Sequence, residues 1–95
     1  FANRQLERCY TDAHEAFRSW GSQVGERYIH RVSLLQRETQ FRRLFTLQGL
    51  RLHPLAGRRQ GQFAMTLTGR WRLIIEVDQQ LGVVTILEVS NHYDD

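Results

Sequence analysis

The chain has 95 residues, a formal net charge of +3, one cysteine and no lysine. This length suits one domain with a modest core, and an apolar fraction of 41% argues against wholesale disorder. One cysteine excludes an internal disulfide, and no apolar run approaches the roughly 20 residues that span a bilayer. We therefore expect a single cytoplasmic domain over residues 1–95 that makes no contact with membranes.

The N-terminal part of the chain has helical periodicity. Apolar residues recur at steps of three and four from Asn3 to Trp20, which predicts one helix with Asn3 as N-cap and Gly21 just after its end. Ser22 is expected to cap a second helix, so that the two form a hairpin. The buried stripe of this second helix is predicted to hold Val24, Tyr28, Val32 and Leu35, with Ile29 beside them. A third turn or short helix is predicted from Gln40 to Leu47, ended by Gly49.

From Leu50 onward the pattern alternates with period two, as in strands. A first strand is predicted from Leu50 to His53, with Pro54 ending it or confining it to a sheet edge. A basic loop over residues 56–60 follows, and three further strands are predicted over residues 63–68, 71–77 and 83–89. Helices followed by an antiparallel meander indicate an α+β fold, in which the helical hairpin packs on a small sheet.

The register of the central hairpin follows from its apolar face. A loop from Thr68 to Arg70 pairs Leu67 with Trp71, Met65 with Leu73 and Phe63 with Ile75, which keeps one face apolar. This register places Thr66 opposite Arg72 on the other face. If the strands pair in chain order, Arg51, His53 and Glu76 project from that second face as well.

Positive charge is concentrated in one part of the chain. Residues 39–75 hold seven arginines and no acidic residue, a formal charge of +7, whereas the remainder has a charge of −4. Such segregation indicates a polyanionic partner, and arginine suits bidentate contacts with phosphate. The candidate site residues are the polar ones that helix packing does not use: Arg51, His53, Arg58, Arg59, Arg70, Arg72, Asn91, His92 and Tyr93.

These residue types could either cleave RNA or simply bind it. Metal-free cleavage needs a base for the 2′-hydroxyl, cations for the phosphorane charge and an acid for the leaving oxygen. Histidine and tyrosine can transfer the protons, and arginine can stabilise the charge. Composition alone favours a basic face that only binds RNA, DNA or an acidic protein segment.

Other chemistry has little support in the sequence. No spacing typical of a metal site occurs, and His92 with Asp94 and Asp95 is more typical of a solvated tail than of a chelate. We therefore expect no metal and no cofactor. Cys9 lies on the apolar stripe of the first helix and is predicted to be buried rather than nucleophilic.

Several segments together resemble the RelE/ParE superfamily of type II toxins, in particular the HigB-like plasmid-maintenance killer branch. They are LHPLAGR at residues 52–58, GQF at 61–63, GRWRLII at 69–75 and ILEVSNHY at 86–93. The opening FANRQL and the order of the elements match that family too. The resemblance implies a RelE-like fold, preceded in the family by a strand of which Phe1 would be the last residue.

The resemblance also implies a function. Members of that branch enter the ribosomal decoding site, cut translated mRNA and are neutralised by a cognate antitoxin, here a HigA-like helix-turn-helix protein. Operator DNA is then bound only through the toxin–antitoxin complex. Carried over by motif, the catalytic residues are His53, Arg72, His92 and Tyr93. The residues expected to bind RNA are Arg51, Arg58, Arg59, Arg70 and Asn91.

The chain departs from the family pattern at one central position. Thr66 stands where the best-known members have a catalytic arginine, which removes one cation next to Arg72. Loss of a charge-stabilising donor lowers rates by about 100-fold or more. The alternatives are therefore a gyrase inhibitor of the ParE type, or a module of the same fold that binds without cutting.

Overall fold

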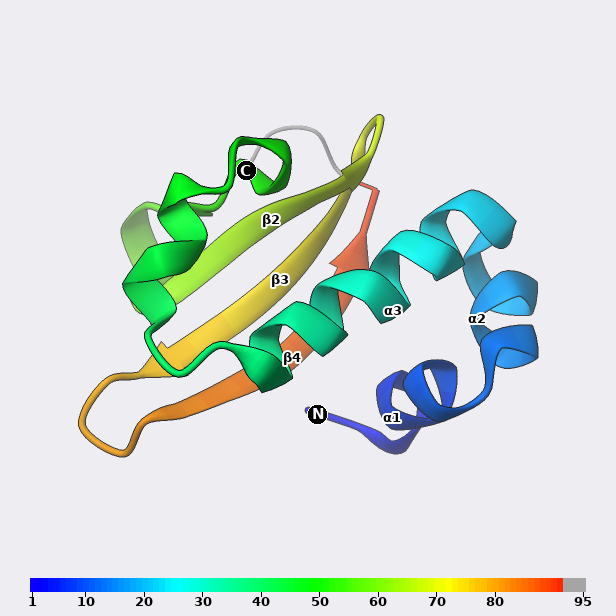
Figure 1. Cartoon of the computed structure of the whole chain (residues 1–95), viewed down its shortest axis with the longest axis horizontal. Coiled ribbons are helices and arrows are strands. Elements are labelled where there is room, and N and C mark those ends of the chain that lie inside the picture. The colour runs from blue at the N-terminus through cyan, green and yellow to red at the C-terminus, as the bar shows by residue number, and fades with distance from the viewer. Residues whose placement is uncertain (92–95) are drawn as a thin grey trace.

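The computed structural model describes residues 1–91 as helices packed on one face of a four-stranded antiparallel sheet (Figure 1). The α-helices are α1 (Arg4–Thr11), α2 (Ala13–Trp20) and α3 (Ser22–Arg37). The short 3₁₀ helices are η1 (Phe41–Thr46), η2 (Gln48–Leu50) and η3 (Gly57–Arg59). The strands are β1 (His53–Pro54), β2 (Gln62–Thr68), β3 (Trp71–Asp78) and β4 (Val83–Ser90), and they lie in the sheet in this order. The α+β class and the meander are confirmed.

The predicted first helix is interrupted at Asp12, so the prediction of one continuous helix was wrong. Asp12 has an extended backbone, and its carboxylate accepts a hydrogen bond from the backbone of His14, which starts α2. Aspartate is a strong N-cap and a poor interior helix residue, and here it begins a new helix. Asn3 caps α1 as predicted, and Gly21 ends α2 at φ 87°. Ser22 does not cap α3, because Gly21 occupies that position.

The stripe predicted for the second helix does form the core side of α3. Val24, Tyr28 and Val32 are buried there, and the Tyr28 hydroxyl donates to the Leu6 carbonyl at 2.6 Å. Burial, with the nearby Cys9, raises the pKa of Tyr28 well above its usual value, so this hydroxyl remains a donor. Cys9 itself is fully buried, as expected. Within residues 1–91 there is no helix with the length and apolar character needed to cross a bilayer.

Gly25 allows α2 and α3 to approach closely. A Cβ at this position would lie 2.8 Å from Phe17 Cδ1 and 3.0 Å from the Ala16 carbonyl carbon. We expect Gly25→Ala to lower the free energy of unfolding by about 1–2 kcal/mol, because overpacking outweighs the gain in helix propensity. Urea unfolding followed by circular dichroism measures this change.

Gly49→Ala is the matched control for that substitution, since a Cβ at Gly49 meets no atom within 4 Å and its φ is not positive. We expect it to leave the unfolding midpoint nearly unchanged. A Gly25→Ala protein as stable as the control would contradict close packing of the two helices.

The strand predicted from Leu50 to His53 is shorter in the structure. Leu50 ends the 3₁₀ helix η2, and Arg51 adopts a left-handed conformation with φ 49°, so neither extends the sheet. Only His53 and Pro54 pair with β2, at Ala64 and Phe63. Pro54 therefore lies on an edge strand, as predicted. The prediction placed both Leu50 and Leu52 inward, and both are buried, but a turn rather than alternation achieves this.

The central hairpin has the predicted register for most of its length. Phe63 pairs with Ile75, Met65 with Leu73, and Thr66 with Arg72. The predicted pair of Leu67 and Trp71 is wrong, because a bulge between Thr66 and Thr68 makes Thr68 the partner of Trp71. The turn is therefore tighter than predicted and contains only Gly69 and Arg70. The bulge keeps Leu67 fully buried without requiring a longer loop.

Candidate nucleic-acid interface

The outer face of the sheet, away from the helices, brings the central predicted site residues together. Partners in a ladder project to the same face, and so do residues two apart in one strand. His53 pairs with Ala64, and Thr66 pairs with Arg72, so His53, Thr66 and Arg72 share one face. Ser90 is the partner of Arg72 on β4, and Asn91 follows it directly. Glu76 also lies on this face, as predicted, through its pairing with Gln62.

His53 is fixed in one tautomer by a local hydrogen bond. Its Nδ1 lies 2.9 Å from the Arg51 carbonyl oxygen, which can only accept, so Nδ1 carries the hydrogen. In the neutral imidazole, Nε2 is then the basic nitrogen. The ring is half-buried at the edge of the sheet. Arg51 contributes to this arrangement through its backbone, which its left-handed conformation turns toward the histidine.

Arg72 is held by its own hairpin. Its Nη1 donates to the Gly69 carbonyl at 2.7 Å and to the Trp71 carbonyl at 3.1 Å. These two bonds orient the guanidinium group relative to the turn. The hairpin turn therefore acts as a support that presents the cation at one end of the outer face.

His53 and Arg72 lie apart on the outer face of the sheet. They are offset by two strand spacings and two residues, which gives a Cα–Cα distance of about 12 Å from standard sheet geometry. Both side chains rise from the same face, and Thr66 lies between the two positions. A group such as a phosphodiester could contact both of them at once.

Acidic residues from outside the acid-free window reach the arginines of that window. Arg59 Nη2 lies 3.6 Å from Glu88 Oε2, and Arg59 Nε donates to Gln62 Oε1 at 2.9 Å. Glu88 comes from β4, outside the acid-free window, and pairs with Ile74 on the outer face. Arg43 similarly lies 4.0 Å from Glu38. Tertiary contacts thus bring carboxylates next to residues 39–75, a segment that contains no acidic residue.

The other predicted RNA-binding arginines surround the outer face without clustering on it. Arg58 is exposed in η3, Arg70 is exposed at the tip of the β2–β3 hairpin, and Arg51 is exposed beside β1. Arg42 and Arg43 belong to η1, whose Phe41 ring packs 5.2 Å from Phe63 on the helix side of the sheet. The basic window is therefore divided between two sides of the molecule.

A small apolar cluster underlies the outer face. It contains Leu55, Ala64 and Ile74, with Leu87 packed against them. A second bulge, between Ile74 and Ile75, gives Leu87 no partner in the ladder and lets it join this cluster. Alternation alone had not indicated any apolar cluster on this face.

Sequence reasoning missed a group of basic residues on α3. Arg31 is only 5% exposed, and its Nε donates to the Thr66 carbonyl at 3.2 Å. Arg27 Nη1 donates to the neighbouring Leu67 carbonyl at 3.4 Å. The signal was present in the spacing, because Arg31 follows Tyr28 by three residues and therefore lies beside the buried stripe.

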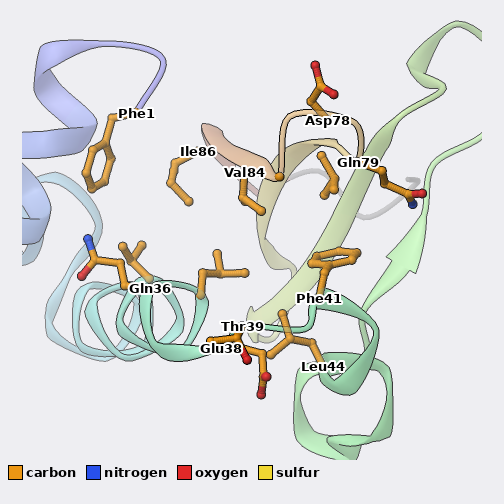
Figure 2. Close-up of a pocket in the computed structure, with 14 residues that line it drawn as sticks. Phe1, Gln36, Glu38, Thr39, Phe41, Leu44, Asp78, Gln79, Val84 and Ile86 are labelled. Atoms are coloured by element: carbon orange, nitrogen blue, oxygen red, sulfur yellow. The ribbon is translucent and has the colours of Figure 1, made fainter.

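A cavity elsewhere in the structure is lined by none of the predicted site residues. It has a volume of about 540 Å³ and opens between α3, η1 and the β3–β4 end of the sheet (Figure 2). Its apolar side chains include Phe1, Phe41, Leu44, Val84 and Ile86. Its carboxylates already have local roles, since Asp78 accepts from the backbone of Gln80 and Leu81, and Glu38 accepts from the backbone of Gln40.

Two predicted catalytic residues, His92 and Tyr93, lie outside the described residues. Within residues 1–91 no group of three histidine, cysteine or carboxylate side chains is arranged to hold a metal ion. No family model matches the chain, and no curated protein matches it. The RelE/ParE resemblance therefore remains a prediction from the sequence motifs.

Proposed function

We propose that the protein is a ribosome-dependent mRNA endonuclease, the toxin of a type II toxin–antitoxin system. Its partners would be the ribosome, translated mRNA and a cognate antitoxin that neutralises it. The proposal rests on the sequence motifs together with one structural observation. His53, with its tautomer fixed, and Arg72, held by its hairpin, rise from the same face of the sheet.

The chemistry proposed for this face needs no metal. His53 Nε2 would accept the proton of the 2′-hydroxyl as that oxygen attacks the adjacent phosphorus. The Arg72 guanidinium would stabilise the charge that builds up on the phosphorane oxygens. His92 and Tyr93 remain predicted proton-transfer residues, and either would donate a proton to the leaving 5′-oxygen. The products would be a 2′,3′-cyclic phosphate and a 5′-hydroxyl.

The experiment compares mRNA cleavage and DNA breakage by the same purified protein. We expect cuts in mRNA on translating ribosomes, with 5′-hydroxyl ends, and no cuts in the same mRNA without ribosomes. The companion assay mixes the protein with gyrase and supercoiled DNA. Gyrase-dependent double-strand breaks with intact mRNA would overturn the proposal in favour of the ParE-type alternative.

Two structural features favour a second candidate, a module of this fold that binds RNA without cutting it. Thr66 offers no cation opposite Arg72, and the carboxylate of Glu88 offsets the positive charge of Arg59 on the same face. Such a module would block translation and crosslink to ribosomes, yet leave every mRNA intact. The cleavage assay separates it from the nuclease directly.

A further inference from the structure

The basic group on α3 has an unusual charge balance. Arg31 is buried, yet neither Arg31 nor Arg27 forms an ion pair with any carboxylate among residues 1–91. Arg31 uses Nε for the Thr66 carbonyl and Nη1 for His30 Nδ1 at 2.7 Å. Because arginine can only donate, His30 Nδ1 must accept and is therefore deprotonated. Burying a cation without a counter-charge is unfavourable, so an anion bound beside Arg31 would be stabilising.

The electrostatic surroundings of His30 point the same way. Desolvation lowers the pKa of His30, and Arg31, Arg37 and Arg27 lower it further. The pKa of Arg31 is lowered by burial and then by Arg27. On the facing strand β2, Arg31 contacts the uncharged carbonyl of Thr66, and Arg27 contacts that of Leu67. Glu26 is the one carboxylate lining the same recess among the described residues.

The hydrogen bonds from Arg27 and Arg31 to the carbonyls at the β2 bulge explain only part of why these arginines lie here. Two carbonyl dipoles compensate a guanidinium less well than a carboxylate does. Among residues 1–91, protein groups take two of the five N–H donors of Arg31 and one of the five of Arg27. The recess in front of them, formed by Gln23, Glu26, Arg27, His30 and Arg31, is open and has a volume of about 510 Å³. It can admit a tetrahedral anion.

We propose that this α3 recess binds a phosphate group, with Arg27 and Arg31 as donors. His30 becomes protonated at Nδ1 in the complex, which ends its hydrogen bond from Arg31 Nη1 and leaves both groups able to donate to the anion. The carbonyls that these arginines hold belong to the β2 segment opposite Arg72. An RNA strand that crosses β2 near Thr66 could therefore contact both the outer face and α3. Naming RNA as the source of the phosphate rests on the proposed function, whereas the anion site itself does not.

NMR titration of the histidine resonances tests the site in the intact protein. Sulfate is the first probe, because its charge stays constant near neutral pH, whereas phosphate titrates there. A bound anion favours protonated His30, so saturating sulfate should raise the pKa of His30. By linkage, sulfate should bind more tightly as pH falls through that pKa. His14, exposed on α2, is the internal control and should not respond.

Charge variants sharpen the test. Arg27→Gln should weaken sulfate binding about tenfold, the effect of losing one charge-assisted hydrogen bond. Glu26→Gln should strengthen it, because it removes the one carboxylate of the recess. Arg18→Gln, on the exposed surface of α2, should leave binding unchanged. The proposed site would be disproved if Arg27→Gln and Arg18→Gln weakened sulfate binding equally. It would also be disproved if sulfate changed the resonances of His30 and His14 equally.

Two further ligands identify the source of the phosphate. Inorganic phosphate and a short single-stranded RNA, with 2′-O-methyl sugars to prevent cleavage, are titrated separately without ribosomes. We expect both to shift His30, and RNA to do so at lower concentration. A response to phosphate but not to RNA would overturn RNA as the ligand. Because this assay needs no catalysis, absence of mRNA cleavage would disprove the nuclease without affecting the anion site.

Discussion

Replacing Arg72 by alanine is expected to lower the rate of ribosome-dependent mRNA cleavage by about 100-fold or more. Removing one preorganised donor to a developing oxyanion has effects of this size. The cross-strand partner of Arg72 is Thr66, which carries no charge to share this role. Single-turnover cleavage on programmed ribosomes, followed by primer extension, measures the change. The cleavage rate of Arg72→Lys should lie between those of the unmodified protein and Arg72→Ala, because lysine keeps the charge but lacks the planar set of donors.

The matched control for Arg72 must separate catalysis from folding. Arg72 also donates to the Gly69 and Trp71 carbonyls, so its loss weakens the hairpin by about 1 kcal/mol. The unfolding midpoint of each variant is therefore measured alongside its activity. Arg18→Ala removes an equally charged side chain on α2, where Arg18 pairs with Glu15. If Arg72→Ala still cut mRNA at the wild-type rate, Arg72 would have no role in the chemistry.

The sequence predicted the fold where one rule acted alone. Period-two alternation with one buried face fixed the register from Phe63 to Thr66, because a one-residue slip would expose that whole face. Prediction failed where two different local backbone conformations would bury the same residue. Leu50 and Leu52 are buried by a 3₁₀ turn rather than by a strand, and Leu67 is buried by a bulge rather than by a longer loop.

The candidate site was predictable only in part, because charge partners are set by tertiary contacts. The acid-free window correctly located the arginines, but Glu88 lies 29 positions after Arg59 and meets it through the β3–β4 pairing. Arg31 was missed for a related reason. A charged residue beside a core stripe usually extends to solvent, whereas here it reaches the bulge carbonyls of β2. Nothing in the local pattern of α3 reveals that bulge.

Thr66→Arg is expected to raise mRNA cleavage by about 10- to 100-fold. The backbone of Thr66 is already held by Arg31, and its side chain projects beside Arg72, so an arginine here would bring a second guanidinium to the same phosphate. Two like charges facing each other across strands repel, and the free protein should lose up to about 1 kcal/mol of stability. Added sulfate should restore much of that loss, since an anion between the two cations relieves the repulsion.

The control for Thr66→Arg places the same charge elsewhere on the same face. Thr85 pairs with Glu76 on the outer face, far along β3 from Arg72, so Thr85→Arg changes the net charge equally. If general attraction for RNA governed the rate, both variants would gain activity alike, and the gain would vanish at high salt. If the position opposite Arg72 matters, only Thr66→Arg gains, and the gain appears in the single-turnover rate rather than in ribosome affinity. An unchanged rate in Thr66→Arg would mean that Thr66 is not the reason for any weakness of this site, and that the arginine pair expected from the family motif has no counterpart here.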